Sequence, residues 1–335
     1  MRNIRVVFAV LSLSVVLVAG VADELQAQEK RQGWTKRLRY RRELRRELQG
    51  EIQLSGAFAL YPMAVKWAEE FRKIHPKVRI DISAGGAGKG ITDALAKVVD
   101  LGMVSRDIYP QELEKGAFPI AVVKDAVVPT INSNNPLIDQ ILATGLKQQV
   151  AQDLWIHTTA RTWGDVLGTG STIPVHVYTR SDACGAAETF AAWLGAKQED
   201  LEGTAVFGDP GVTSVVQRDK VGIGFNNIAY AYDINSKKPY RHIAVIPLDL
   251  NGNGKIDPEE DFYATSTELN AAIAEGKYPS PPARNLFLVS NGKPMKPEVL
   301  AFLEFILTDG QYAPEVGYIG LSSDILEEEL FKLQE

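Results

Sequence analysis

From residue 51 onward, the apolar positions alternate between a period of two and a period of three to four. Alternating or continuous apolar runs predict strands over 51–54, 78–82, 100–104, 122–132, 174–179, 221–225, 243–248 and 285–290. Helical spacing predicts helices over 61–75, 91–98, 186–194 and 297–308. Turns rich in small residues lead from strands directly into helices, an order that is typical of parallel sheets. The pattern therefore predicts an α/β fold.

The first 27 residues have the pattern of a signal peptide. Arg2 and Arg5 precede a mostly apolar run over 6–22, and small residues near its end suit a cleavage site. An uncleaved membrane anchor is the alternative, although about 17 residues is short for a span. Residues 28–50 are rich in Lys and Arg and predict a basic tether, which either stays in solvent or touches anionic lipid headgroups. We therefore expect an exported protein, periplasmic or secreted.

Composition narrows the function classes. The length of 335 residues is more than one core of typical size, so we expect two lobes. The net charge of −6, despite the basic tether, implies an acidic main body and argues against nucleic-acid binding. The single cysteine, Cys184, excludes an intramolecular disulfide and a CxxC zinc site. The four histidines are scattered and give little support to metal-dependent hydrolysis.

The turn before the helix at 186–194 is the best candidate for a binding site. A helix start presents unpaired backbone N–H groups that attract anions, and Arg180 adds a bidentate, charge-assisted donor. Asp182 is placed to hold that guanidinium or to cap the helix, and Cys184, Gly185 and Ala186 supply backbone donors. The alternatives are a plain N-cap turn with a surface Arg–Asp pair, or a reactive Cys184 thiol with a lowered pKa. No histidine lies in a recognised catalytic motif nearby, so we do not expect an enzyme.

Two more strand-to-helix turns carry small residues. One includes Ala57, Phe58 and Ala59, and the other includes Ala87 and Gly88. The second turn lacks the order of a nucleotide P-loop, because Lys89 is followed by glycine. Each turn alone is also consistent with an ordinary connection. Together the three turns are expected to face one crevice, where α/β sheets bind ligands.

Four segments carry a specific resemblance: GAFALYPMAVKWAEEF, SAGGAGKG, VDLGMVSRDI and YTRSDACGAAETF. They resemble the phosphate-binding protein family of ABC phosphate importers, over roughly residues 51–335. The resemblance implies a two-lobe periplasmic binding fold of type II with a hinge, crossed near 129–132 and 284–290. Lobe one would comprise 51–132 and 284–335, and lobe two 133–283. It also implies a monomer that delivers phosphate to a membrane permease; a secreted sensor on the same fold is the alternative.

The sequence departs from this family at positions that usually supply ligand donors. Hydroxyl residues are replaced at Phe58, Ala87, Cys184 and Ala186. Some members have at position 106 an Asp that accepts the proton of phosphate, whereas others have Ser-Arg, as in Ser105-Arg106. A site with two arginines and no acceptor favours a fully ionised oxyanion. Sulfate, tungstate, molybdate and small organic anions therefore stay open beside phosphate.

Residues 249–260 match the twelve-residue calcium loop. The ligand positions would be Asp249, Asn251, Asn253, the carbonyl of Lys255, Asp257 and Glu260. Because the preceding segment reads as a strand and not as a helix, we expect one structural Ca²⁺ and not a paired sensor. The alternative is an Asn/Gly turn followed by an acidic helix start.

Overall fold

The computed structural model describes residues 48–334, and Gln49–Glu335 form a compact unit of their own. The predicted signal peptide, and the basic residues at 30–46 of the predicted tether, lie outside the described residues. Among residues 48–334, no helix is both long enough and apolar enough to span a bilayer.

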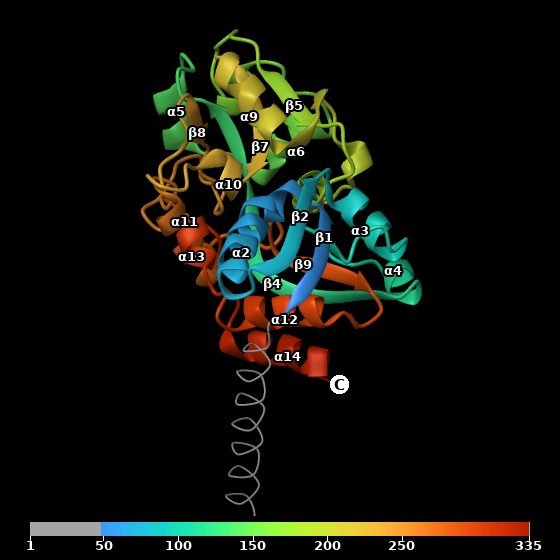
Figure 1. Ribbon diagram of the computed structural model, residues 1–335. Coiled ribbons are helices and arrows are strands. Elements are labelled where there is room, and N and C mark those ends of the chain that lie inside the picture. Colours follow the sequence, from blue (N-terminus) through green and yellow to red (C-terminus); the bar gives the residue numbers. More distant parts are fainter. Residues whose placement is uncertain (1–47, 335) are drawn as a thin grey trace, which may run out of the picture. The chain divides into compact units, whose positions relative to one another are not determined.

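Nine strands form one continuous mixed sheet in the order β2-β1-β3-β9-β4-β7-β5-β6, with β8 on β4 (Figure 1). Strands β1 and β2 pair in parallel, as do β1 and β3, β5 and β6, and β5 and β7, whereas β4 and β9 make antiparallel ladders. The bounds are β1 Gln49–Gly56, β2 Lys77–Ala84, β3 Leu101–Val104, β4 Ala117–Asn132, β5 His176–Arg180, β6 Thr204–Val206, β7 Gly222–Asn227, β8 Ile243–Val245 and β9 Ala283–Asn291.

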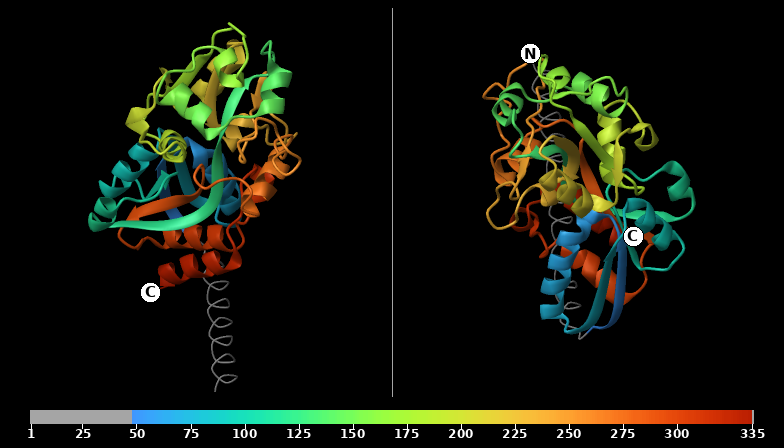
Figure 2. Two further views of the ribbon diagram at one scale, coloured as in Figure 1. Left: turned by 180° about the vertical axis from the view of Figure 1, so that it is seen from behind. Right: turned by 90° about the horizontal axis from the view of Figure 1, so that it is seen from above.

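The long strand β4 passes from one half of the sheet to the other (Figure 2). Its residues up to Ala126 pair with β9, whereas its residues from Val127 onward pair with β7 and β8. The change of partner therefore comes earlier than the predicted crossing at 129–132. Within the described part of the chain, strand β9 pairs with β3 and β4 alone, so the chain returns to the first half before Ala283. The chain thus has the two-lobe arrangement, and the lobe boundaries given above stay a prediction.

Helices cover both halves of the sheet. Those of the first half come from both ends of this unit, since α2 lies beside β2, α3 beside β1 and β3, α12 beside β1, and α14 beside β4 (Figure 1). The bounds are α2 Tyr61–Ile74, α3 Ala87–Leu95, α4 Pro110–Glu114, α5 Ile138–Thr144, α6 Gln148–Trp155, α7 Trp163–Leu167, α8 Gly185–Trp193, α9 Gly208–Arg218, α10 Ile228–Ala231, α11 Ser266–Ala274, α12 Pro297–Leu307, α13 Ala313–Val316 and α14 Ser323–Gln334, with 3₁₀ turns η1 Phe58–Leu60 and η2 Gln198–Asp200.

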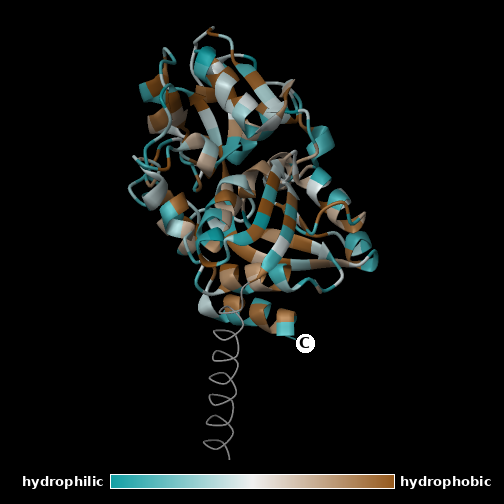
Figure 3. Ribbon diagram, in the orientation of Figure 1, coloured by the Kyte–Doolittle hydropathy of each residue, from teal (hydrophilic) through white to brown (hydrophobic). Residues whose placement is uncertain are grey.

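Each half has its own apolar centre, and the buried strands are mostly apolar (Figure 3). In the first, Phe71 of α2 meets Phe302 of α12 at 5.2 Å between ring centroids. In the second, Phe190 of α8 stacks on Phe225 of β7 at 4.4 Å. This stacking anchors the helix whose start carries the candidate site.

Every predicted strand and helix is present with ends shifted by a few residues; α3, for example, starts at Ala87 rather than at 91. Strand β6 and several helices were not predicted: α4, α5, α6, α7, α9, α10, α11, α13 and α14. Helix α9 begins with Gly-Asp-Pro-Gly, a sequence that reads as a turn. Its residues Val212 and Val216 are nevertheless buried, so packing outweighs that local signal.

Candidate functional site

Strand β5 ends at Arg180, and helix α8 begins five residues later at Gly185. Cys184 is the N-cap residue, and its sulfur accepts a hydrogen bond from the amide of Ala187 at 3.5 Å. The amides of Gly185 and Ala186 belong to the first turn, which has no intrahelical acceptors. The start of α8 is therefore buried and offers backbone donors and a partial positive charge.

The Arg180 guanidinium is held by two carboxylates. Its Nε and Nη2 donate to the two oxygens of Asp182 at 2.8 and 2.6 Å, and its Nη1 donates to Oδ2 of Asp209 at 2.7 Å. The side chain is buried, and so are both partners. A guanidinium has five N–H groups, so these bonds leave two for a ligand. Asp182 thus orients the arginine, while Asp209, which the sequence did not single out, competes with any anion for it.

The electrostatics of the turn favour a charged arginine and a neutral thiol. Burial by itself would lower the pKa of Arg180, but the carboxylates of Asp209 and Asp182 outweigh it and raise that pKa above its usual value. Burial raises the pKa of the Cys184 thiol to about 12, and the nearby Arg180 only partly opposes this shift. A thiol with so high a pKa is not an activated nucleophile at neutral pH.

The three predicted turns do meet. The amides of Gly85 and Gly86 both donate to the carbonyl of Gly56, at 2.8 and 3.0 Å, which joins the first turn to the second. The amide of Gly88 donates to the carbonyl of Ala183 at 3.2 Å, which joins the second turn to the start of α8. Ala57, Ala59 and Ala87 are buried at these junctions, with backbone atoms and methyl groups but no hydroxyl to offer a ligand.

Two glycines allow this close approach. A Cβ at Gly86, whose φ is +90°, would lie 2.9 Å from the carbonyl oxygen of Ala183. A Cβ at Gly185 would lie 2.0 Å from the carbonyl oxygen of Ser105, well inside van der Waals contact. Ser105 itself is buried at the end of β3. The backbone of α8 therefore packs directly on the strand end that carries Ser105.

Phe58 lies over the arginine. Its ring centroid is 5.9 Å from Cζ of Arg180, and Phe207 meets it edge to face at a centroid distance of 5.9 Å. The hydroxyl of Tyr230 donates to the carbonyl of Phe58 at 3.1 Å. Phe58 and Phe207 thus form an aromatic wall beside the arginine.

Arg106 is engaged elsewhere. Its Nη1 and Nη2 bond the carboxylate of Glu112 at 2.9 and 2.7 Å, and its Nε lies 3.1 Å from Oε2 of Glu188. Its guanidinium also stacks 4.1 Å from the ring centroid of Tyr109, whose hydroxyl bonds Glu188. Since Glu188 belongs to α8, this cluster ties the segment after β3 to that helix. Arg106 was predicted to contact the oxyanion, whereas in the structure its guanidinium is paired with Glu112 and Glu188.

A third buried arginine, Arg284 of β9, was missed by the sequence reasoning. Its Nε donates to the carbonyl of Ser105 at 2.7 Å, and its Nη2 donates to Oδ1 of Asn227. Asn227 in turn donates through its backbone and side chain to Oδ1 of Asp209, at 3.0 and 2.8 Å. Arg284 and Arg180 therefore sit at two ends of one buried chain of polar contacts.

The loop over 249–260 folds back on its own carboxylates. Asp249 accepts hydrogen bonds from the amides of residues 252, 253 and 254, and Glu260 accepts from those of 250 and 251. Asp257 pairs with Lys255 at 2.6 Å, and this hydrogen bond leads the contacts that lower the pKa of Asp257 to about 2. Within residues 48–334, no three side chains of His, Cys, Asp or Glu are gathered as a metal site.

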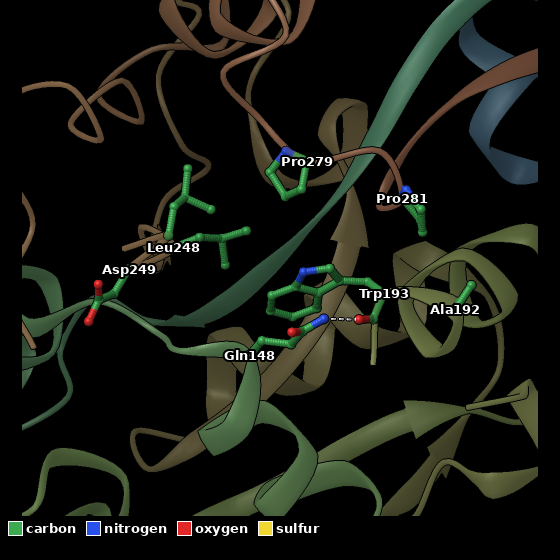
Figure 4. Close-up of a pocket in the computed structure, with 8 residues that line it drawn as sticks. Gln148, Ala192, Trp193, Leu248, Asp249, Pro279 and Pro281 are labelled. Atoms are coloured by element: carbon green, nitrogen blue, oxygen red, sulfur yellow. Dashed lines mark hydrogen bonds between the residues drawn. The ribbon is translucent and has the colours of Figure 1, made fainter. Parts of the chain in front are cut away.

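An open cavity of about 460 Å³ lies beside this loop, away from Arg180 (Figure 4). Gln148 and Trp193 form its floor, joined by a hydrogen bond from the Gln148 side chain to the Trp193 carbonyl. None of the eight lining residues belongs to the three turns: Gln148, Ala192, Trp193, Leu248, Asp249, Leu250, Pro279 and Pro281.

Comparison with known proteins places this geometry in a family. The model of the PBP superfamily domain matches residues 43–310. The chain belongs to the PBP superfamily. Protein SphX of Synechococcus elongatus is 29% identical over 279 residues, which is 81% of this chain and 77% of SphX. The phosphate-binding protein PstS of Pseudomonas aeruginosa is 27% identical over 311 residues, with 85% of this chain and 87% of PstS covered.

Solved structures agree on the fold. A putative phosphate ABC transporter substrate-binding protein from Clostridium perfringens, solved with bound phosphate, has a TM-score of 0.67 at 22% identity, over 82% of this chain and all of that one. An ABC-type phosphate transport receptor from Vibrio cholerae has a TM-score of 0.59 at 19% identity, over 81% of this chain and all of that one. The predicted two-lobe periplasmic binding fold is thereby confirmed.

Proposed function

We propose that this member of the PBP superfamily is an extracytoplasmic solute-binding protein that captures phosphate for an ABC importer. The observation that carries the proposal is Arg180, a buried and charged guanidinium at the start of α8 with two N–H groups left for a ligand. Phosphate as the ligand is inferred from the relatives, a phosphate-binding protein and a phosphate-bound substrate-binding protein, and export is inferred from the predicted signal peptide at 1–27. The partner would be a membrane permease, with the protein itself a monomer.

Calorimetry with phosphate tests the proposal. Arg180→Gln keeps a polar side chain but removes the charge and should weaken phosphate binding by at least about tenfold, the scale of a lost charge-assisted hydrogen bond. Arg218→Gln, an exposed residue of α9, serves as the matched control and should bind as the wild type does. Wild-type protein that binds sulfate, tungstate or molybdate but not phosphate would refute phosphate as the ligand. Unchanged phosphate binding by Arg180→Gln would refute the assignment of the site to Arg180.

Calcium binding by residues 249–260 is a second part of the proposal. The support is the complete ligand pattern together with the closed shape of the loop, in which the amides of residues 250 and 251 donate hydrogen bonds to the Glu260 carboxylate. A Ca²⁺ ion would have to replace loop amides and the Lys255 ammonium as partners of the carboxylates. The charge of Ca²⁺ would offset the repulsion among the three carboxylates Asp249, Asp257 and Glu260. The ammonium of Lys147, 3.9 Å from the Asp249 carboxylate, offsets part of that charge.

Thermal melting with and without a chelator tests the calcium site. Wild-type protein should melt at a lower temperature in EGTA than in millimolar Ca²⁺, since binding to the folded state stabilises it by mass action. Asp249→Asn should lose most of this difference, whereas the exposed neighbour Glu259→Gln should keep it. Equal melting temperatures of the wild type in both conditions would refute calcium binding by this loop.

A further inference from the structure

A cluster of charged side chains joins the two halves of the sheet beside the start of α8. Arg106 follows β3 of the first half, and Glu112 of α4 in the same half bonds its guanidinium at 2.7 and 2.9 Å. Glu188 of α8 belongs to the second half, and its Oε2 lies 3.1 Å from Nε of Arg106. The hydroxyl of Tyr109, also from the first half, bonds the Glu188 carboxylate. Two donors of the first half thus hold one carboxylate of the second half.

The Arg180 guanidinium is closed off from solvent in this arrangement, since its side chain has 0% exposure. The backbones of the two halves touch there. The amide of Gly88 donates to the carbonyl of Ala183, and a Cβ at Gly185 would lie 2.0 Å from the carbonyl oxygen of Ser105. An anion from solvent can therefore reach Arg180 only when α8 moves away from the first half.

The cluster can open without leaving an unpaired buried charge. When α8 moves away, Arg106 keeps the carboxylate of Glu112, which the amide of Tyr109 also holds at 2.9 Å. The Glu188 side chain is already 26% exposed, and it would pass into water. A buried ion pair that loses one partner strongly destabilises a folded protein, and the second carboxylate avoids that cost here. The contact is therefore suited to breaking and forming again.

We propose that Arg106, Tyr109 and Glu188 form a latch that gates the Arg180 site. The latch holds α8 against the first half, and it has to break before an anion enters or leaves. Arg106 is then a positioning residue that acts through α8, in place of the ligand contact that the sequence had suggested. The kinetic test of the latch rests on the phosphate binding proposed above, whereas its structural test does not.

A latch has a kinetic signature that a contact to the ligand lacks. Loss of a ligand contact mainly speeds dissociation, because mutants of one binding site differ mostly in their dissociation rates. Loss of a latch raises the fraction of protein in the open form, to which the ligand has access. It also lets the bound form open more often. Association and dissociation should therefore both become faster.

Stopped-flow mixing with phosphate at pH 8, followed by tryptophan fluorescence, measures both rate constants. Glu188→Gln keeps the shape of the side chain but removes its charge, so both constants should rise at least about fivefold, a scale between an exposed ion pair and a charge-assisted hydrogen bond. Tyr109→Phe removes the hydroxyl and keeps the ring beside Arg106, so both constants should rise by a smaller factor. Glu199→Gln is the matched control and should change neither, because Glu199 is exposed and forms no ion pair within residues 48–334.

The outcomes separate the latch from the proposed function. In Glu188→Gln, faster dissociation with unchanged association would indicate a contact of the bound state alone and would overturn the latch, as would two unchanged constants. Wild-type protein that binds no phosphate would overturn the proposed function, and X-ray scattering of ligand-free protein would then decide on the latch. The radius of gyration should increase in Glu188→Gln, and an unchanged value would overturn the latch. If Glu188→Gln does not fold by circular dichroism, Tyr109→Phe decides by the same criteria.

Discussion

Replacing Asp125 by asparagine should make the protein less sensitive to alkaline pH. The side chain is fully buried, and burial raises its pKa to about 7, although the nearby charge of Arg284 opposes the shift and that of Asp209 adds to it. In the unfolded chain the pKa of an aspartate is about 3.9. The folded protein therefore binds more protons than the unfolded chain between these values. The contribution of Asp125 to stability falls as the pH rises through this window and is constant above it.

The magnitude follows from the width of the window. Between pH 5.5 and the folded pKa of about 7 lie 1.5 pH units. Each pH unit is worth about 1.4 kcal/mol, so ionisation of Asp125 should lower the free energy of unfolding by about 2 kcal/mol over that range. Asparagine has a similar shape and does not titrate. The difference in unfolding free energy, variant minus wild type, should therefore grow by about 2 kcal/mol from pH 5.5 to pH 8.

Urea unfolding followed by tryptophan fluorescence measures this difference at both pH values. Asp139→Asn, an exposed carboxylate on α5, is the control and should change little with pH relative to the wild type. A difference that grows by less than about 0.5 kcal/mol for Asp125→Asn would show that the carboxyl is not held in its neutral form. The reasoning from burial would then be refuted.

Two further predictions concern the start of α8. Glu188→Gln removes the ion pair with Arg106 and weakens the bond to Tyr109, so ligand-free protein should open and its radius of gyration by X-ray scattering should increase; the exposed Glu199→Gln should not change it. Alkylation of Cys184 by iodoacetamide at pH 8 should be at least about 100-fold slower in folded than in urea-unfolded protein, because its folded pKa of about 12 leaves little thiolate. Equal alkylation rates would instead support a reactive thiol.

The sequence by itself predicted the order of the main strands and helices and singled out the turn at Arg180 as the candidate site. Strands and helices differ in the period of their apolar residues, and that period is local, so β1, α2, β2 and most later strands could be placed before any contact was known. The turn after β5 was also local, since a strand end, a basic residue and a helix start follow one another within a few positions. The family resemblance rested on the same short segments. The calcium loop, another local pattern, stays a prediction.

Only the tertiary structure decided which charges meet. Asp125 and Arg284 are adjacent because β4 and β9 pair in one particular antiparallel register, which no local pattern specifies. Asp209 reaches Arg180 because α9 packs beside β5 and β7. Arg106 is turned toward Glu188 for a similar reason, since the partner lies on a distant helix. The net charge of a site is a sum over neighbours from many segments, and those neighbours are known only once the chain has folded.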